Sequence, residues 1–374
     1  MSAAAIPAPL VREHLARLAD LLRPTDLAAV VVFHPSNMRA FLGTDWSSSD
    51  RLLCGAVTRA GRAVAVCPAF ERPALDPIAA WTHIATWEEH EDPYAALLRA
   101  LADAGAAHGP LGVDGRMWVD SLERLAAAAA PRPVRNAEAL LREVRLIKSP
   151  AELDVLREAQ RRGERAFAVV AELLRPGVSE RELCDAVTAR FAPEGLHVVP
   201  LVQSGPNAAV PHSPTGTRRI APGETVVVDS VIAWQGYCND LTRTFAVGDP
   251  PARARAAYRA VRAAQAAAIA AAGPGVPCGR LDAVARQAIT AAGFGPYFVH
   301  RLGHGIGVEG HEPPYLVAGN AEPLRPGMVC TVEPGIYVPG EFGIRIEDVI
   351  IITEGGCEVI RGTLATDVSA ALEA

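Results

Sequence analysis

Two pairs of carboxylates, each placed on a predicted β-hairpin, are the residues of this sequence best suited to chemistry. In the first pair, Asp229 follows three consecutive valines and Asp240 lies on the stretch of chain that returns. If the chain turns between Trp234 and Gln235, the two aspartates face each other across an antiparallel pair of strands. Like charges in that position destabilise a hairpin unless a positive group lies between them. The first pair therefore predicts a cation site.

The second pair repeats this arrangement further along the chain. Glu333 ends a predicted strand, Glu347 lies in the next one, and their midpoint is Gly340, in a turn-rich segment. Each acid alone would be a surface ion pair or a strand end, but two such pairs with a histidine supply about the charge that two divalent cations need. Oxygen-dominated ligation suits Mn, Co, Fe or Zn, whereas structural zinc prefers thiolates. We expect two divalent metal ions per chain, with Mn, Co or Zn favoured.

The histidine-rich segment from His300 to Glu312 lies between the two hairpins. Its residues 305–310 match the pattern GxGxxG, but a dinucleotide loop needs a helix directly afterwards, and two prolines follow Glu312. The segment therefore does not predict nucleotide binding. His304 is the best metal-ligand candidate, because the glycines around it let the backbone pass close to a site. His212, with prolines on either side and just before the first hairpin, is either functional or part of a rigid turn.

Length and composition describe an ordinary globular protein that is long enough for two domains. The chain has 374 residues, and its 36 basic and 42 acidic side chains give a net charge of −6. Without a basic stripe, this charge argues against nucleic-acid binding. The seven cysteines are scattered without a CxxC pair, which is typical of a reducing compartment, and no apolar run is long enough for a membrane span. We therefore expect a cytoplasmic protein that binds neither nucleic acid nor membranes.

The elements that must position these residues fall into two blocks. The first part of the chain alternates strands and helices, which is typical of an α/β module. Its predicted elements are strands 27–33 and 111–113, a hairpin of 52–57 and 63–67, and helices 92–106 and 118–130.

From Ser149 onward the order changes to pairs of strands and pairs of helices, which predicts an α+β domain. Ser149 and Ser179 each begin a capping box for a helix, and the first helix is expected to run to about Leu174. The remaining predicted elements are strands 198–203, 225–233, 237–247, 328–333, 344–353 and 358–360 and helices 251–272 and 280–292. We place the two domains at residues 1–145 and 146–374.

Five motifs, taken in order, resemble those of the metal-dependent creatinase/aminopeptidase family, M24, whose catalytic domain has the pita-bread fold. They are the Asp229–Asp240 segment, GHGIG, the following HE-P, EPGIY and RIED. The resemblance covers about residues 140–374, and residues 37–43 resemble part of the creatinase-type N-terminal domain. It implies an α+β fold with a pita-bread catalytic domain after a smaller α/β domain. The two-domain plan is most similar to prolidases, which are Xaa-Pro dipeptidases, and to Xaa-Pro aminopeptidases.

The resemblance also implies a role for each candidate residue of a metallopeptidase. Asp229 would bind one metal ion, His304 and Glu333 the other, and Asp240 and Glu347 would bridge both. The remaining candidates are expected around the substrate: His212 and His311 as catalytic residues together with Glu333, and His300, Tyr237 and Arg345 as substrate-binding residues. The implied substrates are small proline-containing peptides, and the implied assembly is a homodimer.

Several features leave the substrate open. A dipeptidase must bind the free carboxylate of its substrate, commonly through an arginine, and the candidates are Arg301, Arg218 and Arg219. An Xaa-Pro aminopeptidase acting on longer peptides is therefore the alternative. Two further alternatives are a family member that acts on another small C–N or C–S substrate and a binding protein on the same scaffold. Val231 stands where many relatives have glycine, and its larger side chain is expected to narrow the pocket or alter substrate choice.

Overall fold

The computed structural model describes residues 5–46, 50–198, 200–361 and 370–373. The chain divides into two compact units, Ser2–Arg145 and Leu146–Ala374, and each is described by itself. Among the helices of the described residues, none combines the length and the apolar character that a membrane crossing requires.

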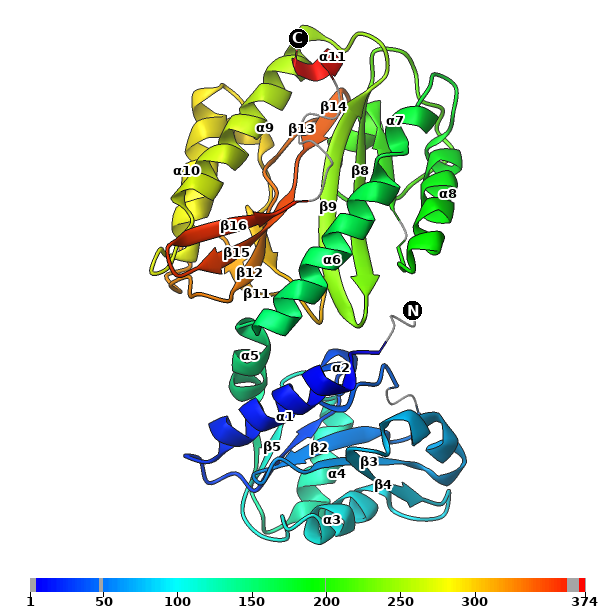
Figure 1. Cartoon of the computed structure of the whole chain (residues 1–374), viewed down its shortest axis with the longest axis vertical. Coiled ribbons are helices and arrows are strands. Elements are labelled where there is room, and N and C mark those ends of the chain that lie inside the picture. Colours follow the sequence, from blue (N-terminus) through cyan, green and yellow to red (C-terminus); the bar gives the residue numbers. More distant parts are fainter. Residues whose placement is uncertain (1–4, 47–49, 199, 362–369, 374) are drawn as a thin grey trace. The chain divides into compact units, whose positions relative to one another are not determined.

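The N-terminal unit is built on one six-stranded mixed sheet (Figure 1). In spatial order its strands are β4 (Thr82–Trp87), β3 (Ala63–Pro68), β2 (Cys54–Thr58), β1 (Ala29–Val32), β5 (Leu111–Val113) and β6 (Val134–Asn136). The pairs β1–β2 and β2–β3 are antiparallel, whereas β3–β4, β1–β5 and β5–β6 are parallel. The predicted hairpin in this unit, now β2 and β3, is confirmed.

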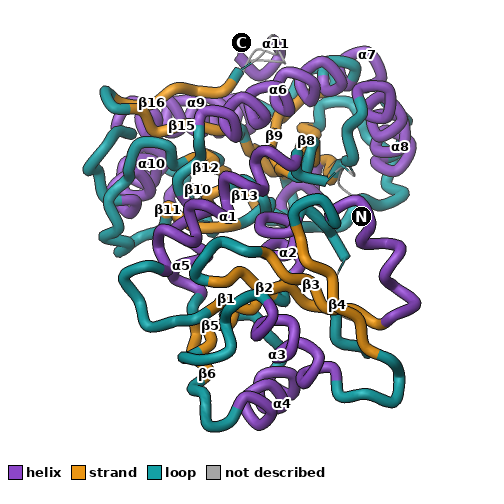
Figure 2. Tube along the Cα trace, turned by 60° about the horizontal axis from the view of Figure 1, so that its bottom comes forward, coloured by secondary structure: helices purple, strands orange, loops and turns teal. Residues whose placement is uncertain are grey.

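Helices pack on both faces of this sheet. They are α1 (Ala8–Leu22), α2 (Pro35–Leu42), α3 (Pro93–Asp103) and α4 (Val119–Ala129). Helices α3 and α4 lie together on one side (Figure 2), where Leu97 and Leu125 share a buried cluster with Val31. On the opposite face Leu42 of α2 fills the space above Gly55, where a Cβ atom would lie 2.2 Å from Leu42 Cδ1. The four central strands are therefore buried on both sides, whereas the edge strands β4 and β6 are partly exposed.

The C-terminal unit contains three antiparallel sheets. The three-stranded sheet consists of β7 (Leu201–Ser204), β8 (Thr225–Trp234) and β9 (Tyr237–Ala246). The five-stranded sheet has the order β11 (Glu312–Leu316), β10 (Gly303–Gly305), β12 (Val329–Val332), β15 (Asp348–Thr353) and β16 (Gly356–Ile360). The two-stranded sheet pairs β13 (Gly335–Val338) with β14 (Phe342–Arg345).

Two helices of this unit begin at the capping boxes expected from the sequence. The helices of the unit are α6 (Pro150–Phe167), α7 (Val170–Leu173), α8 (Glu180–Phe191), α9 (Ala252–Ala271), α10 (Cys278–Ala291) and α11 (Ala370–Glu373), whereas α5 (Glu138–Leu146) belongs to the N-terminal unit except for its last residue. Both predicted capping boxes are present, with Ser149 and Glu152 at α6 and Ser179 and Glu182 at α8. The helix expected to run to about Leu174 instead ends at Phe167, and α7 follows as a separate turn.

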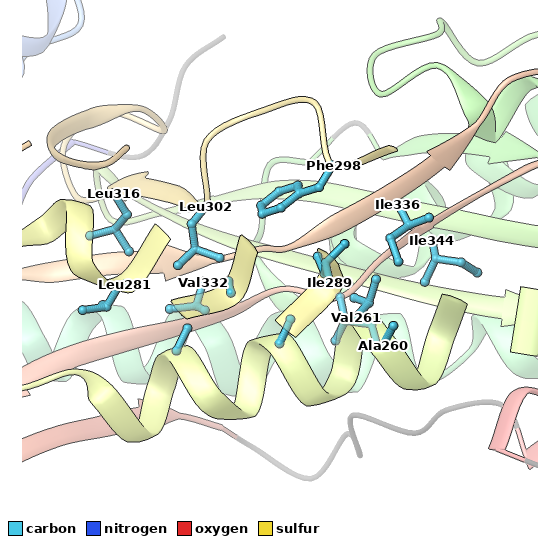
Figure 3. Packing of buried hydrophobic residues seen from close by; sticks show 14 of the residues in the cluster. Ala260, Val261, Leu281, Ile289, Phe298, Leu302, Leu316, Val332, Ile336 and Ile344 are labelled. Carbon is cyan, nitrogen blue, oxygen red and sulfur yellow. The ribbon is translucent and has the colours of Figure 1, made fainter. Parts of the chain in front are cut away.

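Among the described residues, two hydrophobic clusters hold these elements together. One joins α6–α8 to β8 and β9 through residues such as Phe167, Leu183 and Val228. The other joins α9 and α10 to β12–β14, and Figure 3 shows Val261 and Ile289 of these helices among its buried residues. The two layers meet where Thr242 and Glu347 form an isolated antiparallel bridge. This bridge brings the first pair of carboxylates to the second.

The hairpin of β8 and β9 has a register that differs from the prediction. Asp229 pairs with Thr242, and Asp240 pairs with Val231, so the two aspartates lie diagonally across the ladder. The turn consists of Gln235 and Gly236, which have φ angles of 47° and 78°. A two-residue turn with two positive φ angles matches the twist of the strands, and a glycine as the second residue favours it. The predicted turn between Trp234 and Gln235 was therefore wrong by one residue.

The second hairpin keeps the predicted register but is interrupted. The β12–β15 and β13–β14 ladders are both centred on Gly340, as predicted. Glu333 and Glu347 lie between these ladders rather than within one continuous pair of strands. Both carboxylates therefore lie at the break between the two ladders, and Glu347 forms a bridge there with Thr242 of the first hairpin.

Candidate active site

A cavity of about 250 Å³ in the C-terminal unit is lined by nine of the ten predicted site residues. Tyr237 is the exception, and Pro211, Val231 and Arg301 complete the lining. The predicted ligands come from four different segments: β8, β9, the histidine-rich segment and the interrupted hairpin. The fold thus gathers residues that lie up to 135 positions apart, from His212 to Glu347.

The potential metal ligands form overlapping groups. In one group His304, Glu333 and Glu347 offer ligand atoms that all lie within 4.8 Å of one another, and in another Asp229, Asp240 and Glu347 do so. Asp240 also lies in a third group with His304 and His311. Glu347 belongs to both of the first two groups. Asp240 connects the group that contains Asp229 to His304. This overlap is the arrangement that two neighbouring cations with shared carboxylates require.

Thr242 connects the carboxylates of the two hairpins. Its hydroxyl oxygen lies 2.8 Å from Asp229 Oδ1 and 2.7 Å from Glu347 Oε2. The Glu347 backbone N–H also donates to the Thr242 carbonyl at 3.1 Å. A hydroxyl has one proton and can donate to only one carboxylate at a time. Thr242 was not singled out in the sequence, although its cross-strand position opposite Asp229 identifies it once the register is known.

The electrostatics of the two predicted bridging carboxylates favour a cation. Burial, and then the neighbouring carboxylates, raise the pKa of Asp240 and of Glu347 well above the ordinary range. Glu347 Oε1 is buried and has no hydrogen-bond partner among the described residues. A buried carboxylate oxygen without a donor is costly unless a positive ion neutralises it. The residues present therefore fit divalent metal ions.

His304 and Glu333 form a close pair on the opposite side of this cluster. His304 Nε2 lies 3.2 Å from Glu333 Oε1. Burial acts against the charged forms, but the contact outweighs it, so the pKa of His304 is raised and that of Glu333 is lowered. His304 Nδ1 lies 3.0 Å from the Gly305 carbonyl, which can only accept, so Nδ1 carries a proton. Nε2 is then the atom directed at the ligand cluster, as in metal-binding histidines.

Tyr337, which the sequence analysis did not select, connects three of the predicted residues. Its hydroxyl accepts from Arg345 Nη1 at 2.8 Å and lies 2.9 Å from His300 Nε2. Arg345 Nη2 donates in turn to Asp229 Oδ2 at 2.7 Å. Burial raises the pKa of Tyr337 to about 12, so its hydroxyl stays protonated and can donate to His300. The sequence offered one signal for this residue, because Tyr337 ends the EPGIY motif that begins with Glu333.

Tyr237, by contrast, lies outside the cavity, which corrects its predicted role in substrate binding. Its side chain is fully buried, and its hydroxyl donates to Glu152 Oε1 of α6 at 3.0 Å. The reason is strand alternation: Tyr237 and Asp240 are three residues apart in β9 and point to opposite faces. Tyr237 therefore supports the packing of α6 behind the site.

Arg301 and His311 lie next to each other in the cavity lining, where Arg301 supplies a guanidinium group and His311 an imidazole ring. The His311 ring stacks on His304 with centroids 3.8 Å apart, and Arg301 Nη2 lies 3.4 Å from His311 Nδ1. Partial removal from water, and then His304, lower the pKa of His311 to about 4, so its ring is neutral near pH 7. Arg301 also lies over the ring of Tyr315 at 4.5 Å. No carboxylate pairs with its guanidinium within the described ranges of the chain.

The two other candidate arginines have partners elsewhere. Arg218 forms an ion pair with Glu224, and Arg219 lies 3.7 Å from Glu182, so neither lines the cavity.

A buried ion pair supports the segment that carries the histidines. Lys148, the single lysine of the chain, lies 2.7 Å from Glu312, and the two side chains are 1% and 2% exposed. A Cβ atom added to Gly307 would lie 2.8 Å from both side chains. Gly307, the second glycine of the GxGxxG pattern, thus lets the backbone pass close to this pair. As predicted, no helix follows the segment directly; it leads instead into β11, a strand that was not predicted from the sequence.

Comparisons with known proteins agree with this two-unit organisation. The family model described as metallopeptidase family M24 matches residues 154–354, and the creatinase/prolidase N-terminal domain model matches residues 14–147. A probable dipeptidase, PepE, of Mycobacterium tuberculosis is 36% identical over 355 residues, covering 93% of this chain and 94% of that protein.

Solved structures are similar along nearly the whole chain. The dipeptidase PepE of Mycobacterium ulcerans is 35% identical with a TM-score of 0.87, covering 96% of this chain and 97% of that one. An Xaa-Pro dipeptidase of Bacillus anthracis is 29% identical with a TM-score of 0.83, covering 94% and 97%.

Proposed function

The chain belongs to metallopeptidase family M24, and on this premise we propose that it is an Xaa-Pro dipeptidase using two divalent metal ions. The ions would be held by the five ligands that line the cavity: Asp229, Asp240, His304, Glu333 and Glu347. Divalent ions at such a site activate water at neutral pH and polarise the carbonyl oxygen of the substrate. Mn, Co or Zn suits this set of carboxylates with one imidazole.

The side chains around the cluster have the properties that amide hydrolysis needs. Water adds to the carbonyl carbon of Xaa, the C–N bond breaks, and one proton passes from the water to the proline nitrogen. The carboxylate of Glu333 lines the cavity beside His304 and could carry that proton. His212 and His311 line the cavity and can donate hydrogen bonds to the oxygen on which negative charge develops.

The observation that carries the dipeptidase proposal is the position of Arg301. The cavity has a volume of about 250 Å³ and is lined both by carboxylates and by Arg301, whose Nη2 lies 3.4 Å from His311 Nδ1. A dipeptide carries a positive amino group and a negative carboxylate a short distance apart. A site of this size with charges of both signs matches those two groups, whereas a longer peptide has no carboxylate at that position.

The function is tested by a peptide panel after metal removal. Protein treated with a chelator is expected to be inactive, and addition of Mn, Co or Zn should restore hydrolysis of Ala-Pro. Ala-Pro should be cleaved at least about tenfold faster in kcat/KM than Ala-Ala, Pro-Ala or Ala-Pro-Ala. Chromatography of the released amino acids measures each reaction. Equal cleavage of Ala-Pro-Ala would favour the aminopeptidase alternative, and activity without metal would exclude the metal site.

Replacing Arg301 with alanine is expected to raise the KM for Ala-Pro by roughly 10- to 100-fold with a smaller change in kcat. A hydrogen-bonded pair of opposite charges contributes about 1.5–3 kcal/mol, and about 1.4 kcal/mol corresponds to a factor of ten. The control substrate is Ala-Pro amide, which lacks the carboxylate. Its KM should change little in the Arg301→Ala variant. Arg219→Ala removes an arginine outside the cavity and is the control variant. Equal losses for Ala-Pro and its amide would show that Arg301 does not bind the carboxylate.

A further inference from the structure

Val231 is an apolar residue in a cavity that is otherwise polar. It is 41% exposed, although it is a β-branched hydrophobic residue in the middle of β8. Among the described residues that line the cavity, only Val231 and Pro211 present hydrocarbon side chains. The remaining lining residues carry imidazole, guanidinium or carboxylate groups. Val231 therefore offers one of the two surfaces there that an apolar substrate group can contact.

The position of this side chain is fixed by its surroundings. Val231 alternates with Asp229 on one face of β8 and pairs directly with Asp240 on β9. On its other side the histidine-rich segment passes closely, because a Cβ atom added to Gly310 would lie 3.3 Å from Val231 Cγ1. The two methyl groups also restrict rotation about χ1. The side chain is thus a rigid wall between the ligand cluster and the segment that carries His311.

The charges of the cavity indicate which end of a dipeptide meets this wall. Asp229 and Asp240 flank Val231, whereas Arg301 lies next to His311. When the carboxylate of a dipeptide binds Arg301, the amino-terminal residue is the one that lies beside the ligand cluster, where the carbonyl group to be hydrolysed must be. The side chain of the amino-terminal residue then lies along Val231, and the carboxyl-terminal residue lies away from it.

We propose that Val231 is a specificity-determining residue that limits the size of the amino-terminal residue of the substrate. This inference rests on the proposed dipeptidase function and adds the substrate class: dipeptides whose first residue is small, such as glycine or alanine. A rigid isopropyl group in a cavity of about 250 Å³ excludes a large side chain at that position.

The test compares Gly-Pro, Ala-Pro, Leu-Pro and Phe-Pro with wild-type protein and three variants. For wild type, kcat/KM should fall from Ala-Pro to Phe-Pro. Val231→Ala should raise the ratio of kcat/KM for Phe-Pro to that for Ala-Pro by about tenfold or more, because methyl-sized changes in a pocket alter discrimination by roughly 10- to 200-fold. Val231→Thr keeps the volume and should keep the ratio. Val317→Ala, 38% exposed and outside the cavity, is the matched control.

The outcomes separate this inference from the proposed function. If wild type cleaves Ala-Pro and the ratio in active Val231→Ala equals that of wild type, Val231 does not set the size limit. A ratio that changes equally in Val317→Ala would also overturn the inference. Failure of metal-loaded wild type on every Xaa-Pro dipeptide would refute the proposed function alone. The same variants would then be compared on Ala-Ala and Phe-Ala, where an unchanged ratio again rejects the role of Val231.

Discussion

Replacing Glu347 with glutamine, or Asp240 with asparagine, is expected to lower kcat/KM by about 10³-fold or more, together with loss of bound metal. Both carboxylates belong to more than one of the potential ligand groups, so under the proposed function each neutral amide would weaken the binding of both ions. Metal activation of water and of the carbonyl is worth several kcal/mol, and about 1.4 kcal/mol corresponds to a factor of ten. Steady-state kinetics and elemental analysis of the purified variants measure both effects.

Although the same substitutions should lower activity, they should raise the thermal stability of chelator-treated protein. Glu347 and Asp240 are buried beside other carboxylates, and removing one negative charge relieves their repulsion. Tm of the metal-free variant should therefore exceed that of metal-free wild type, by roughly 2–4 °C for each kcal/mol of repulsion removed. Asp249→Asn, with a side chain 90% exposed, is the control. A variant that keeps both its metal and its activity would remove that residue from the bridging role.

Replacing Lys148 with methionine is expected to lower the free energy of unfolding by about 3–5 kcal/mol. The substitution removes the cation from a buried ion pair and leaves Glu312 in a low-dielectric environment. Because Glu312 directly follows His311, activity should also fall at temperatures where the variant remains folded. Urea unfolding followed by circular dichroism measures the loss of stability.

Two further variants make this prediction specific. Lys148→Met combined with Glu312→Gln should recover part of the lost stability, because the buried negative charge is then removed together with the positive one. Arg157→Met breaks the partly exposed ion pair with Glu358 and should cost at most about 1 kcal/mol. A similar small cost for Lys148→Met would show that the buried pair does not stabilise the histidine-rich segment.

Features encoded over a few residues could be predicted from the sequence. Both capping boxes depend on side chains three residues apart, and both are present. The second hairpin was predicted in register because Gly340 marks its turn within a short segment. The motifs also identified the α+β pita-bread catalytic domain and the smaller creatinase-type domain before it, and both are confirmed.

Features that depend on geometry between segments could not be predicted in the same way. The first hairpin was misplaced because Gln235 adopts a positive φ that its residue type does not signal. The roles of Thr242 and Tyr337 depend on contacts with residues more than 30 positions away, Glu347 and His300. Tyr237 was assigned to the substrate although strand alternation turns it to the opposite face. The ligand residues could be found from their types and spacing, whereas the network that orients them required the fold.

The burial of Lys148 makes this protein unusual toward reagents that react with primary amines. Lys148 is its only side-chain amine and is 1% exposed, so acylating labels and amine-specific cross-linkers find no reactive side chain on the folded surface. Labelling of this residue would require the start of α6 to separate from β11, and its rate would therefore measure how often that region opens. A protease that cleaves only after lysine would depend on the same opening. It would cut once, three residues after Arg145, where the two compact units divide.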